Sequence, residues 1–390
     1  MNIVFAQWTA QTSNSSEVLL GVSFPARDTG FIVGTSGSIL ATVNGGTTWS
    51  QRTSGITKFL RDVYFTSVSS GIAVGESGLI LTTKNKGIAW SAKSSGTTEH
   101  LVHVHFADAL NGMVSGHVGT VLKTTDGGES WNSQTTGKSV ELAGIVMMDS
   151  LNAVAVGFSG TIIRTMDGGE HWNGTNSTTI SDLRGVAFST HRIGCAVGIG
   201  GTMVRTTDGG ETWNGISSGT THDLYDIVFT DSVKGVVVGN GTILHTTNGG
   251  STWQPQSVSF TGDLYGVDLT RDGKGWSVGQ QGKIFQSNNT FTGFRLMHDR
   301  VGSPDFGLEQ NFPNPFNPAT MINYQLPANN TVSLTVYDAV GREAATLVNG
   351  PVEAGIHSVR FDGSQFSSGM YFYKLTAGAF TDVKKFILLR

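Results

Sequence analysis

Tryptophan returns along this chain at a nearly constant interval of 40 or 41 residues. The series runs Trp8, Trp49, Trp90, Trp131, Trp172, Trp213 and Trp253. A constant period of this length indicates one structural unit repeated many times. A unit of about 40 residues cannot bury both faces of a sheet alone, so its copies must pack against one another. The period therefore constrains the fold before any other feature is considered.

Each repeat contains four runs that are typical of β-strands. In one copy, the first run carries the apolar anchors Leu60, Val63 and Phe65, and the second ends in Val74-Gly75. The third run follows a glycine and the fourth opens with the tryptophan. Glycine is abundant, at 53 residues, and charged residues make up only 14%, which suits short strands and tight turns. We predict an all-β chain whose residues 7–295 form a seven-bladed β-propeller.

Closure of the ring has two candidate strands. The first three runs occur seven times, starting at the leucines Leu19, Leu60, Leu101, Leu142, Leu183, Leu224 and Leu264. The fourth run has an extra candidate, because Trp8 precedes the first full repeat and Phe294 stands where an eighth tryptophan would fall. The strand at Trp8 would join the two ends of the propeller and is the simpler solution. The strand at Phe294 is the alternative.

The turn between the third and fourth runs has the pattern Thr-x-Asp/Asn-x-Gly-x-x-Trp. A side chain of Asp or Asn accepts hydrogen bonds from turn amides, glycine adopts positive φ easily, and tryptophan packs over the turn. We expect a structural role in every blade, in preference to calcium or sugar binding. The pattern resembles the Asp-box, or bacterial neuraminidase repeat. Its residues are Asn44 with Trp49, Asn85 with Trp90, Asp126 with Trp131, Asp167 with Trp172, Asp208 with Trp213 and Asn248 with Trp253.

Positions that vary between repeats are candidates for a binding site. The first strand of each blade should line the central channel, so residues beside its anchor leucine should lie at the channel mouth. Acidic residues come just before the leucine at Glu141, Asp182, Asp223 and Asp263. Arginine and tyrosine come just after it at Arg61, Arg184, Tyr225 and Tyr265. The acids are better explained as acceptors for turn amides, whereas arginine and tyrosine favour partner binding.

No metal, cofactor or reactive thiol is expected. His103 and His105 share one side of a strand close to His100, but the sequence offers no third zinc ligand. The single cysteine, Cys195, occupies a position that is apolar in other repeats and should be a small buried residue.

The sequence gives little support for catalysis. It has no P-loop, no HExxH and no arrangement typical of a Ser-His-Asp enzyme. A net charge of −4 gives no reason to expect nucleic acid as a partner. We therefore favour a non-catalytic protein that binds a protein or glycan partner. The alternative is a secreted Asp-box glycoside hydrolase or lyase, because acids stand at the mouth.

The propeller as a whole resembles the photosystem II assembly and stability factors. The resemblance is carried by Leu-x-x-Val-x-Phe followed by Gly-x-x-Val-Gly-x-x-Gly-x-Ile-Leu-x-Thr-x-Asp-Gly-Gly-x-x-Trp. It implies a scaffold that binds protein partners through arginines on one face, for which Arg61 and Arg184 are the matching residues. Propellers of this family also occur without photosynthesis, so no photosynthetic role is implied.

Composition changes near residue 300, where five of the eight prolines fall within residues 304–327. We predict a linker at residues 296–306 and a small Ig-like β-sandwich at residues 307–390, since alternating apolar runs follow the prolines. The segment Asn311-Phe312-Pro313-Asn314-Pro315-Phe316-Asn317-Pro318 is too rich in proline for a central strand and should be an extended docking segment.

This C-terminal module resembles the type A sorting domain of the type IX secretion system. The match rests on the proline-rich segment, Gly341-Arg342-Glu343, Ser368-Gly369-Met370-Tyr371 and Lys384-Lys385. It implies export across the outer membrane, with the secretion machinery and its sortase as partners. The passenger would be released or attached to the cell surface.

The first residues support the same route. Val4-Phe5-Ala6 before Gln7 has small residues where signal peptidase requires them. We expect residues 1–6 to be the remnant of a signal peptide, with an ordinary first strand as the alternative. No apolar run is long enough to span a membrane. A monomer, secreted or on the cell surface, is expected.

Overall fold

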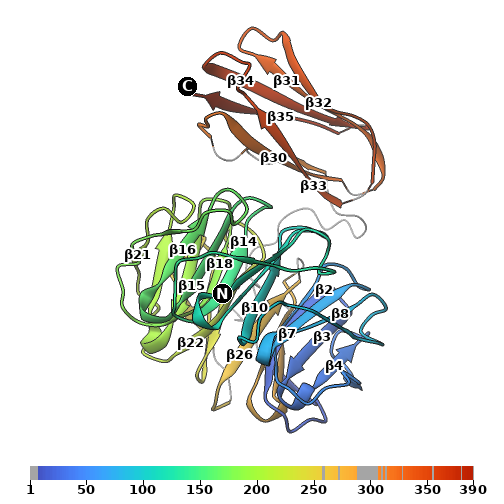
Figure 1. Cartoon of the computed structure of the whole chain (residues 1–390), viewed down its shortest axis with the longest axis vertical. Helices are drawn as coiled ribbons and strands as arrows, with labels where there is room; N and C mark the ends of the chain where they lie inside the picture. Colours follow the sequence, from blue (N-terminus) through green and yellow to red (C-terminus); the bar gives the residue numbers. More distant parts are fainter. Residues whose placement is uncertain are drawn as a thin grey trace, which may run out of the picture. The chain divides into compact units, whose positions relative to one another are not determined.

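The computed structural model of the chain describes residues 8–256, 260–270, 273–287, 306–308, 311, 314–326, 328–353, 355–378 and 380–389. The chain divides into two compact units, Met1–Arg295 and Leu296–Arg390 (Figure 1). The predicted signal-peptide remnant and Phe294 lie outside the described residues. No helix in the described part of the chain has the length and hydrophobicity needed to cross a membrane.

Within the described residues, the first unit forms seven antiparallel four-stranded sheets (Figure 1). The first strands are β2 (Leu19–Ala26), β6 (Leu60–Phe65), β10 (Leu101–Phe106), β14 (Leu142–Met147), β18 (Leu183–Phe188), β22 (Leu224–Phe229) and β26 (Leu264–Leu269). The second strands are β3 (Thr29–Gly34), β7 (Gly71–Gly75), β11 (Gly112–Gly116), β15 (Ala153–Gly157), β19 (Gly194–Gly198), β23 (Gly235–Gly239) and β27 (Gly275–Gly279).

The remaining strands follow the same order in each sheet. The third strands are β4 (Ile39–Thr42), β8 (Leu79–Thr83), β12 (Val121–Thr124), β16 (Ile162–Thr165), β20 (Met203–Thr206), β24 (Thr242–Thr246) and β28 (Ile284–Ser287). The fourth strands are β5 (Ser50–Arg52), β9 (Ser91–Lys93), β13 (Asn132–Gln134), β17 (Asn173–Gly174), β21 (Asn214–Gly215), β25 (Gln254–Pro255) and β1 (Thr9–Gln11). Short 3-10 turns follow six of the second strands: η1 (Thr35–Gly37), η2 (Glu76–Gly78), η3 (His117–Gly119), η4 (Phe158–Gly160), η5 (Ile199–Gly201) and η6 (Gln280–Gly282).

The ring is closed by the strand that follows Trp8. β1 pairs antiparallel with β28, with Gln11 opposite Ile284, and so completes the sheet of β26, β27 and β28. Each first strand packs on the first strand of the next sheet, and β26 packs on β2. The prediction of an all-β propeller is confirmed.

The core lies between neighbouring sheets. In one cluster, Ile72 and Ile80 of one sheet pack against Leu101 and Phe106 of the next. At the closing interface, Trp276 stacks on Phe24 with ring centroids 3.5 Å apart. Because each apolar face needs its neighbour, removal of one sheet would expose two faces.

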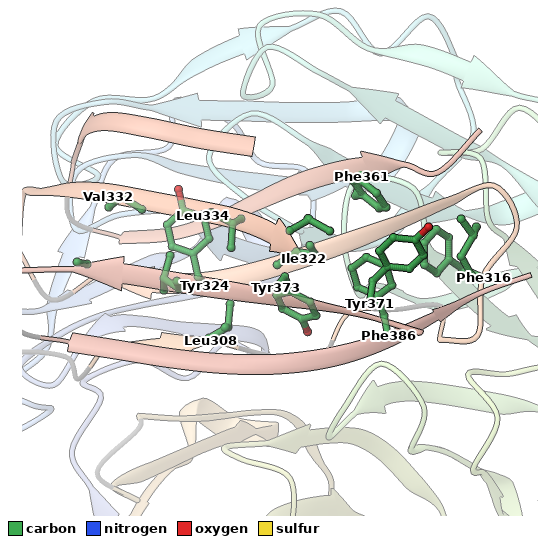
Figure 2. Close-up of a cluster of buried hydrophobic side chains, with 14 of the residues drawn as sticks. Leu308, Phe316, Ile322, Tyr324, Val332, Leu334, Phe361, Tyr371, Tyr373 and Phe386 are labelled. Carbon is green, nitrogen blue, oxygen red and sulfur yellow. The ribbon is translucent and has the colours of Figure 1, made fainter. Parts of the chain in front are cut away.

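The second unit consists of two sheets that enclose one core (Figure 2). One sheet has the order β29–β30–β33 and the other has the order β32–β31–β34–β35. Their bounds are β29 (Gly307–Leu308), β30 (Ala319–Leu326), β31 (Asn330–Asp338), β32 (Glu343–Val352), β33 (Gly355–Asp362), β34 (Gly369–Ala377) and β35 (Phe380–Leu388). The two sheets bury aromatic side chains such as Tyr373 and Phe386 between them. The Ig-like assignment stays a prediction.

The described part of the proline-rich segment holds the last strand in place. Phe316 forms an isolated parallel β-bridge with Leu388. Its amide donates to the carbonyl of Ile387, and its carbonyl accepts the amide of Leu389. Asn314 adds two bonds, since its Oδ1 accepts the Ile387 amide at 2.8 Å and its Nδ2 donates to the Lys385 carbonyl at 3.2 Å. This contact covers part of an edge that would otherwise be open to other strands.

Candidate functional site: the channel mouth

A bulge at the start of every first strand aims one side chain into the central channel. In β6 the pairing with β7 shifts between Leu60 and Asp62, and the other six first strands show the same shift after their leucine. Bulges bend a strand and redirect the residue they contain. The residues at this position are Leu20, Arg61, Val102, Ala143, Arg184, Tyr225 and Tyr265.

All seven of these residues line one cavity of about 500 Å³. Of the mouth candidates named from the sequence, the structure brings Arg61, Arg184, Tyr225, Tyr265 and Glu141 to this cavity. Asp182, Asp223 and Asp263 accept hydrogen bonds from nearby groups.

The two arginines are only loosely paired with acids. Arg184 lies 3.7 Å from Glu141 and 3.8 Å from Asp182, and Arg61 lies 3.9 Å from Glu76, all measured from guanidinium nitrogen to carboxylate oxygen. These distances exceed that of a good charge-assisted hydrogen bond.

Both arginines also keep an unused donor. The Nε–H groups of Arg61 and Arg184 are shielded from solvent and have no acceptor among the described residues. The guanidinium of Arg184 lies over the ring of Phe158, 4.4 Å from its centroid, which holds the side chain in place. Shielded donors without acceptors favour a ligand that brings oxygen atoms.

The tyrosines form a second wall around Asp263. The hydroxyls of Tyr225 and Tyr265 donate to the two oxygens of Asp263 at 3.2 and 3.1 Å, and Asn240 donates to the same carboxylate at 2.7 Å. The two rings lie 5.3 Å apart, centroid to centroid. Burial and the charge of Asp263 raise the pKa of Tyr225, so its phenol stays protonated.

Two of the acids accept amides from the turn beside them. Asp182 accepts the amide of Ser159 at 2.9 Å, and Asp223 accepts the amide of Gly200 at 2.8 Å. Both amides belong to 3-10 turns of the preceding sheet, η4 and η5, so these acids link neighbouring sheets. Neither carboxylate lines the cavity.

Below the mouth, the channel contains acids that the sequence interpretation missed. Asp62 and Asp226 line the cavity beside His103, and Asp268 lies on the neighbouring β26. Burial raises the pKa of all three carboxyls, that of Asp226 to about 6 and that of Asp268 to about 7. For Asp62 and Asp226, the available signal was a charged residue two positions after the anchor leucine, where other repeats have glycine, as at Gly21. Asp268 stands four positions after its leucine and carried no such signal.

The histidines of β10 serve different contacts. His103 Nε2 lies 3.7 Å from Asp62 Oδ2, whereas His105 Nδ1 accepts the amide of Met147 at 3.2 Å. Burial lowers the pKa of His105 to about 3, which keeps this ring neutral.

One group with the geometry of metal ligands occurs among the described residues, at an Asp-box turn. It comprises Asp167, Glu170 and His171, of which the last two are exposed. Asp167 already accepts the hydroxyl of Thr165 at 2.8 Å and the amide of His171 at 3.0 Å. Its Oδ1 therefore already serves the turn, and its Oδ2 lies 2.7 Å from Nδ1 of His171.

The turns with the pattern Thr-x-Asp/Asn-x-Gly-x-x-Trp use their polar atoms internally. In one of them, Asp126 accepts the hydroxyl of Thr124 at 2.7 Å and the amide of Ser130 at 3.0 Å. Gly128 donates its amide to Thr124, and Trp131 donates to the carbonyl of Gly128. The same Thr–Asp or Thr–Asn bond recurs at Asn44, Asn85, Asp167, Asp208 and Asn248.

Solved structures with a similar fold are propellers. The structure described as "YCF48 bound to D1 peptide" is 21% identical, covers 74% of this chain and 98% of its own, and has a TM-score of 0.62. YCF48 from Cyanidioschyzon merolae is 19% identical, with 72% and 98% covered and a TM-score of 0.61. The WD40 β-propeller domain of Doa1 is 12% identical, with 73% and 96% covered and a TM-score of 0.62. At these identities the likeness shows the fold alone.

Two family descriptions match the sequence. The description "Photosynthesis system II assembly factor YCF48" matches residues 2–95, 88–174 and 211–296. The description "Secretion system C-terminal sorting domain" matches residues 310–389 and supports a secreted or cell-surface location. No curated protein matches the chain. The chain belongs to the family of photosynthesis system II assembly factor YCF48 and carries a type IX secretion sorting domain after its propeller.

Proposed function

We propose that the propeller is a non-catalytic scaffold that binds an extended segment of a partner protein at its channel mouth. The observation that carries this proposal is that Arg61 and Arg184 line a cavity of about 500 Å³ while their guanidinium groups are only loosely paired with acids. Carboxylate or carbonyl oxygens of a peptide would satisfy these donors. The wall of Tyr225 and Tyr265 would add aromatic contact of the kind that dominates binding energy at interfaces.

A solved relative supports the class of partner. One YCF48 structure is described as bound to a D1 peptide, and it shares the propeller fold with this chain. We infer a peptide partner by analogy with that protein, without carrying over the identity of the peptide. A glycan partner is the other outcome that the test below distinguishes.

The location proposed for this binding is outside the cell or on its surface. The sorting domain supports a secreted or cell-surface protein. We propose export by the type IX machinery, with removal of the module by its sortase, as the resemblance implies. The partner is then a surface or extracellular molecule.

Site-specific photocrosslinking in the exporting cells tests the partner. A photoreactive residue replaces Val102 or Ala143, which line the cavity without carrying charge. We expect a crosslinked protein that is lost when Arg61→Ala and Arg184→Ala are added. The matched control places the photoreactive residue at the exposed Val43 in an Asp-box turn.

Two outcomes would contradict the proposal. One is a crosslink that survives the double arginine substitution. The other is binding of the purified protein to a glycan array, at unchanged strength in the double variant, with no protein crosslink. Either result would move the binding site away from the two arginines.

A hydrolase is a second candidate on one observation. Asp62 and Asp226 line the same cavity, and burial raises the pKa of both carboxyls, as it does for general acids in glycosidases. Hydrolysis of a polysaccharide panel by the wild type, abolished by Asp226→Asn, would favour this candidate over the scaffold.

A further inference from the structure

Several first strands of the propeller are joined to the next sheet by a side chain that accepts one of its backbone amides. Asp62 Oδ2 accepts the amide of Val104 at 2.9 Å, which links β6 to β10. Asp226 Oδ2 accepts the amide of Val267 at 2.9 Å, which links β22 to β26. These contacts connect residues about 41 positions apart and lie at the interface between two blades.

The closing interface has the same type of bond. Asp268 Oδ2 accepts the amide of Phe24 at 2.6 Å and so links β26 to β2. The second oxygen of each of the three acids accepts the amide of the residue that follows it in the chain. Three of the seven interfaces along the first strands, all of which the structure describes, therefore depend on a carboxyl group.

Neutral groups do the same work at the other interfaces. Ser23 accepts the amide of Phe65, and His105 accepts the amide of Met147. Where no side chain bridges, the backbones approach directly, and a Cβ on Gly144 would come within 2.9 Å of the Arg184 carbonyl oxygen. A charged bridge is thus one of several ways to join two blades.

Asp62 and Asp226 line the same cavity, and Asp268 lies on β26, which packs against the strand that carries Asp226. The charges of Asp62 and Asp226 both raise the pKa of Asp268, and the charge of Asp62 raises the pKa of Asp226. Like charges in a partly desolvated space favour protonation of one or more of them.

The other groups that face this space compensate the charge only in part. β10 contributes His103, which interacts with Asp62 and Asp226, and the neutral His105. β6 also contributes Tyr64, whose pKa is raised to about 12, so that it stays uncharged. The arginines stand one position nearer the mouth, beside Glu76, Glu141 and Asp182, and β2 and β14 present Ser23 and Gly144.

We propose that the ring is a pH-sensitive closure, in which Asp62, Asp226 and Asp268 hold neighbouring blades most firmly when they are partly protonated and less firmly once all three are ionised. An acid protonated on the oxygen that faces the following residue still accepts the amide of the next blade with its other oxygen. Protonation then removes the repulsion and weakens only the bond to the following residue. This proposal is independent of what binds at the mouth.

The direction of the pH dependence follows from the pKa values. The pKa of Asp226 and of Asp268 rises on folding from 3.8 to about 6 and about 7. The folded state then binds more protons than the unfolded state between about pH 4 and pH 7, so stability falls as the pH rises through this window. Above about pH 8 both states are ionised and the effect is constant.

Thermal unfolding of the full chain between pH 4.5 and pH 8.5 tests the proposal, with wild type compared with Asp226→Asn and Asp268→Asn, singly and together. Asparagine keeps one oxygen to accept the cross-blade amide. We expect the Tm of the wild type, relative to the double variant, to fall by about 5 °C between pH 5 and pH 8. The matched control is Asp231→Asn, which removes a carboxylate that accepts two turn amides outside the channel. Its Tm should follow that of the wild type at every pH.

An equal pH dependence in wild type and double variant would overturn the proposal. If the double variant fails to fold, infrared spectroscopy of the wild type provides the second measurement. We expect the carbonyl band of protonated carboxyl groups at pH 5.5, and its loss by pH 8.5. Absence of this band from the folded protein at pH 5.5 would also overturn the proposal.

Discussion

At the scale of single residues, Asp and Asn stand in the same position of successive turns and make the same bonds. Asp126 and Asn44 each accept a threonine hydroxyl two residues earlier in the chain. Asp126 has a titratable carboxyl group and Asn44 does not, and hydrogen bonds change the pKa of this carboxyl. Hydrogen bonds from the side chain and backbone of Ser130 lower the pKa of Asp126 to about 2.

Replacement of the three turn aspartates by asparagine is expected to weaken the pH dependence of stability in acid. At Asp167 and Asp208, hydrogen bonds outweigh the effect of burial, so the pKa of both carboxyls is also lowered. Stability from such groups is present above the unfolded pKa of 3.8 and is lost as the pH falls towards 2.

Denaturant unfolding between pH 2 and pH 5 measures this effect. The triple variant Asp126→Asn, Asp167→Asn, Asp208→Asn should fold, because asparagine already stands in three equivalent turns. Its stability should change less than that of the wild type over this range. The control is Asp231→Asn, and an unchanged slope in the triple variant would show that these turns do not govern the acid limb.

Only some of the channel residues could be predicted from the sequence. The residue after each anchor leucine was predicted to reach the mouth, and the structure places Arg61 and Tyr225 there because a bulge turns them inward. The acids Asp62 and Asp226 were missed, because strand alternation does not reveal which residues of a first strand meet across a closed channel. Their effect depends on three blades brought together by the ring.

At the scale of elements, β1 is the strand that joins the two ends of the propeller. Its residues pair with β28, and Trp8 just before it is only 3% exposed, packed among Val236, Leu264 and Phe285. The indole also donates to Gln256 at 2.6 Å. One short strand thus joins the last sheet to the start of the chain. The sequence favoured this strand and left Phe294 as the alternative, because spacing alone gives both segments the same period.

Substitution of Trp8→Ala is expected to destabilise the propeller by about 3–5 kcal/mol, the usual cost of removing a buried indole. Denaturant unfolding measures the loss. Hydrogen exchange should rise in β28, whose outer neighbour is β1, and stay low in β8 of the second sheet. Trp90→Ala is the control, since that indole packs on Phe65 away from the closure. Equal exchange in β28 of both variants would argue against closure by β1.

At the scale of the whole molecule, a repetitive unit is followed by a unit of different composition. The sequence separated the two because proline clusters near residue 300, and the division between the compact units falls between residues 295 and 296. The exact limits of the predicted linker remain a prediction. Each unit matches a family of its own: residues 310–389 match the sorting domain, and the match to the YCF48 family falls on the propeller.

Deletion of residues 307–390 is expected to leave the propeller in the periplasm, because the secretion machinery would lose its sorting domain. Immunoblotting of periplasm, cell surface and medium measures the distribution. A point control is Arg360→Ala, which removes an exposed ion pair with Asp362 and should leave the module folded. Normal amounts of the truncated protein in the medium would contradict the assignment of the export route.

Pairing of β1 with β28 also affects the order in which the propeller folds. Gln11 and Gln286 bond to each other although 275 positions separate them. During synthesis, β1 therefore stays without its partner until nearly the whole propeller has been made. Contacts between such distant residues form slowly. Closure of the ring is therefore expected to be the last step of folding, after the sheets that lie between β1 and β28 in the sequence have formed.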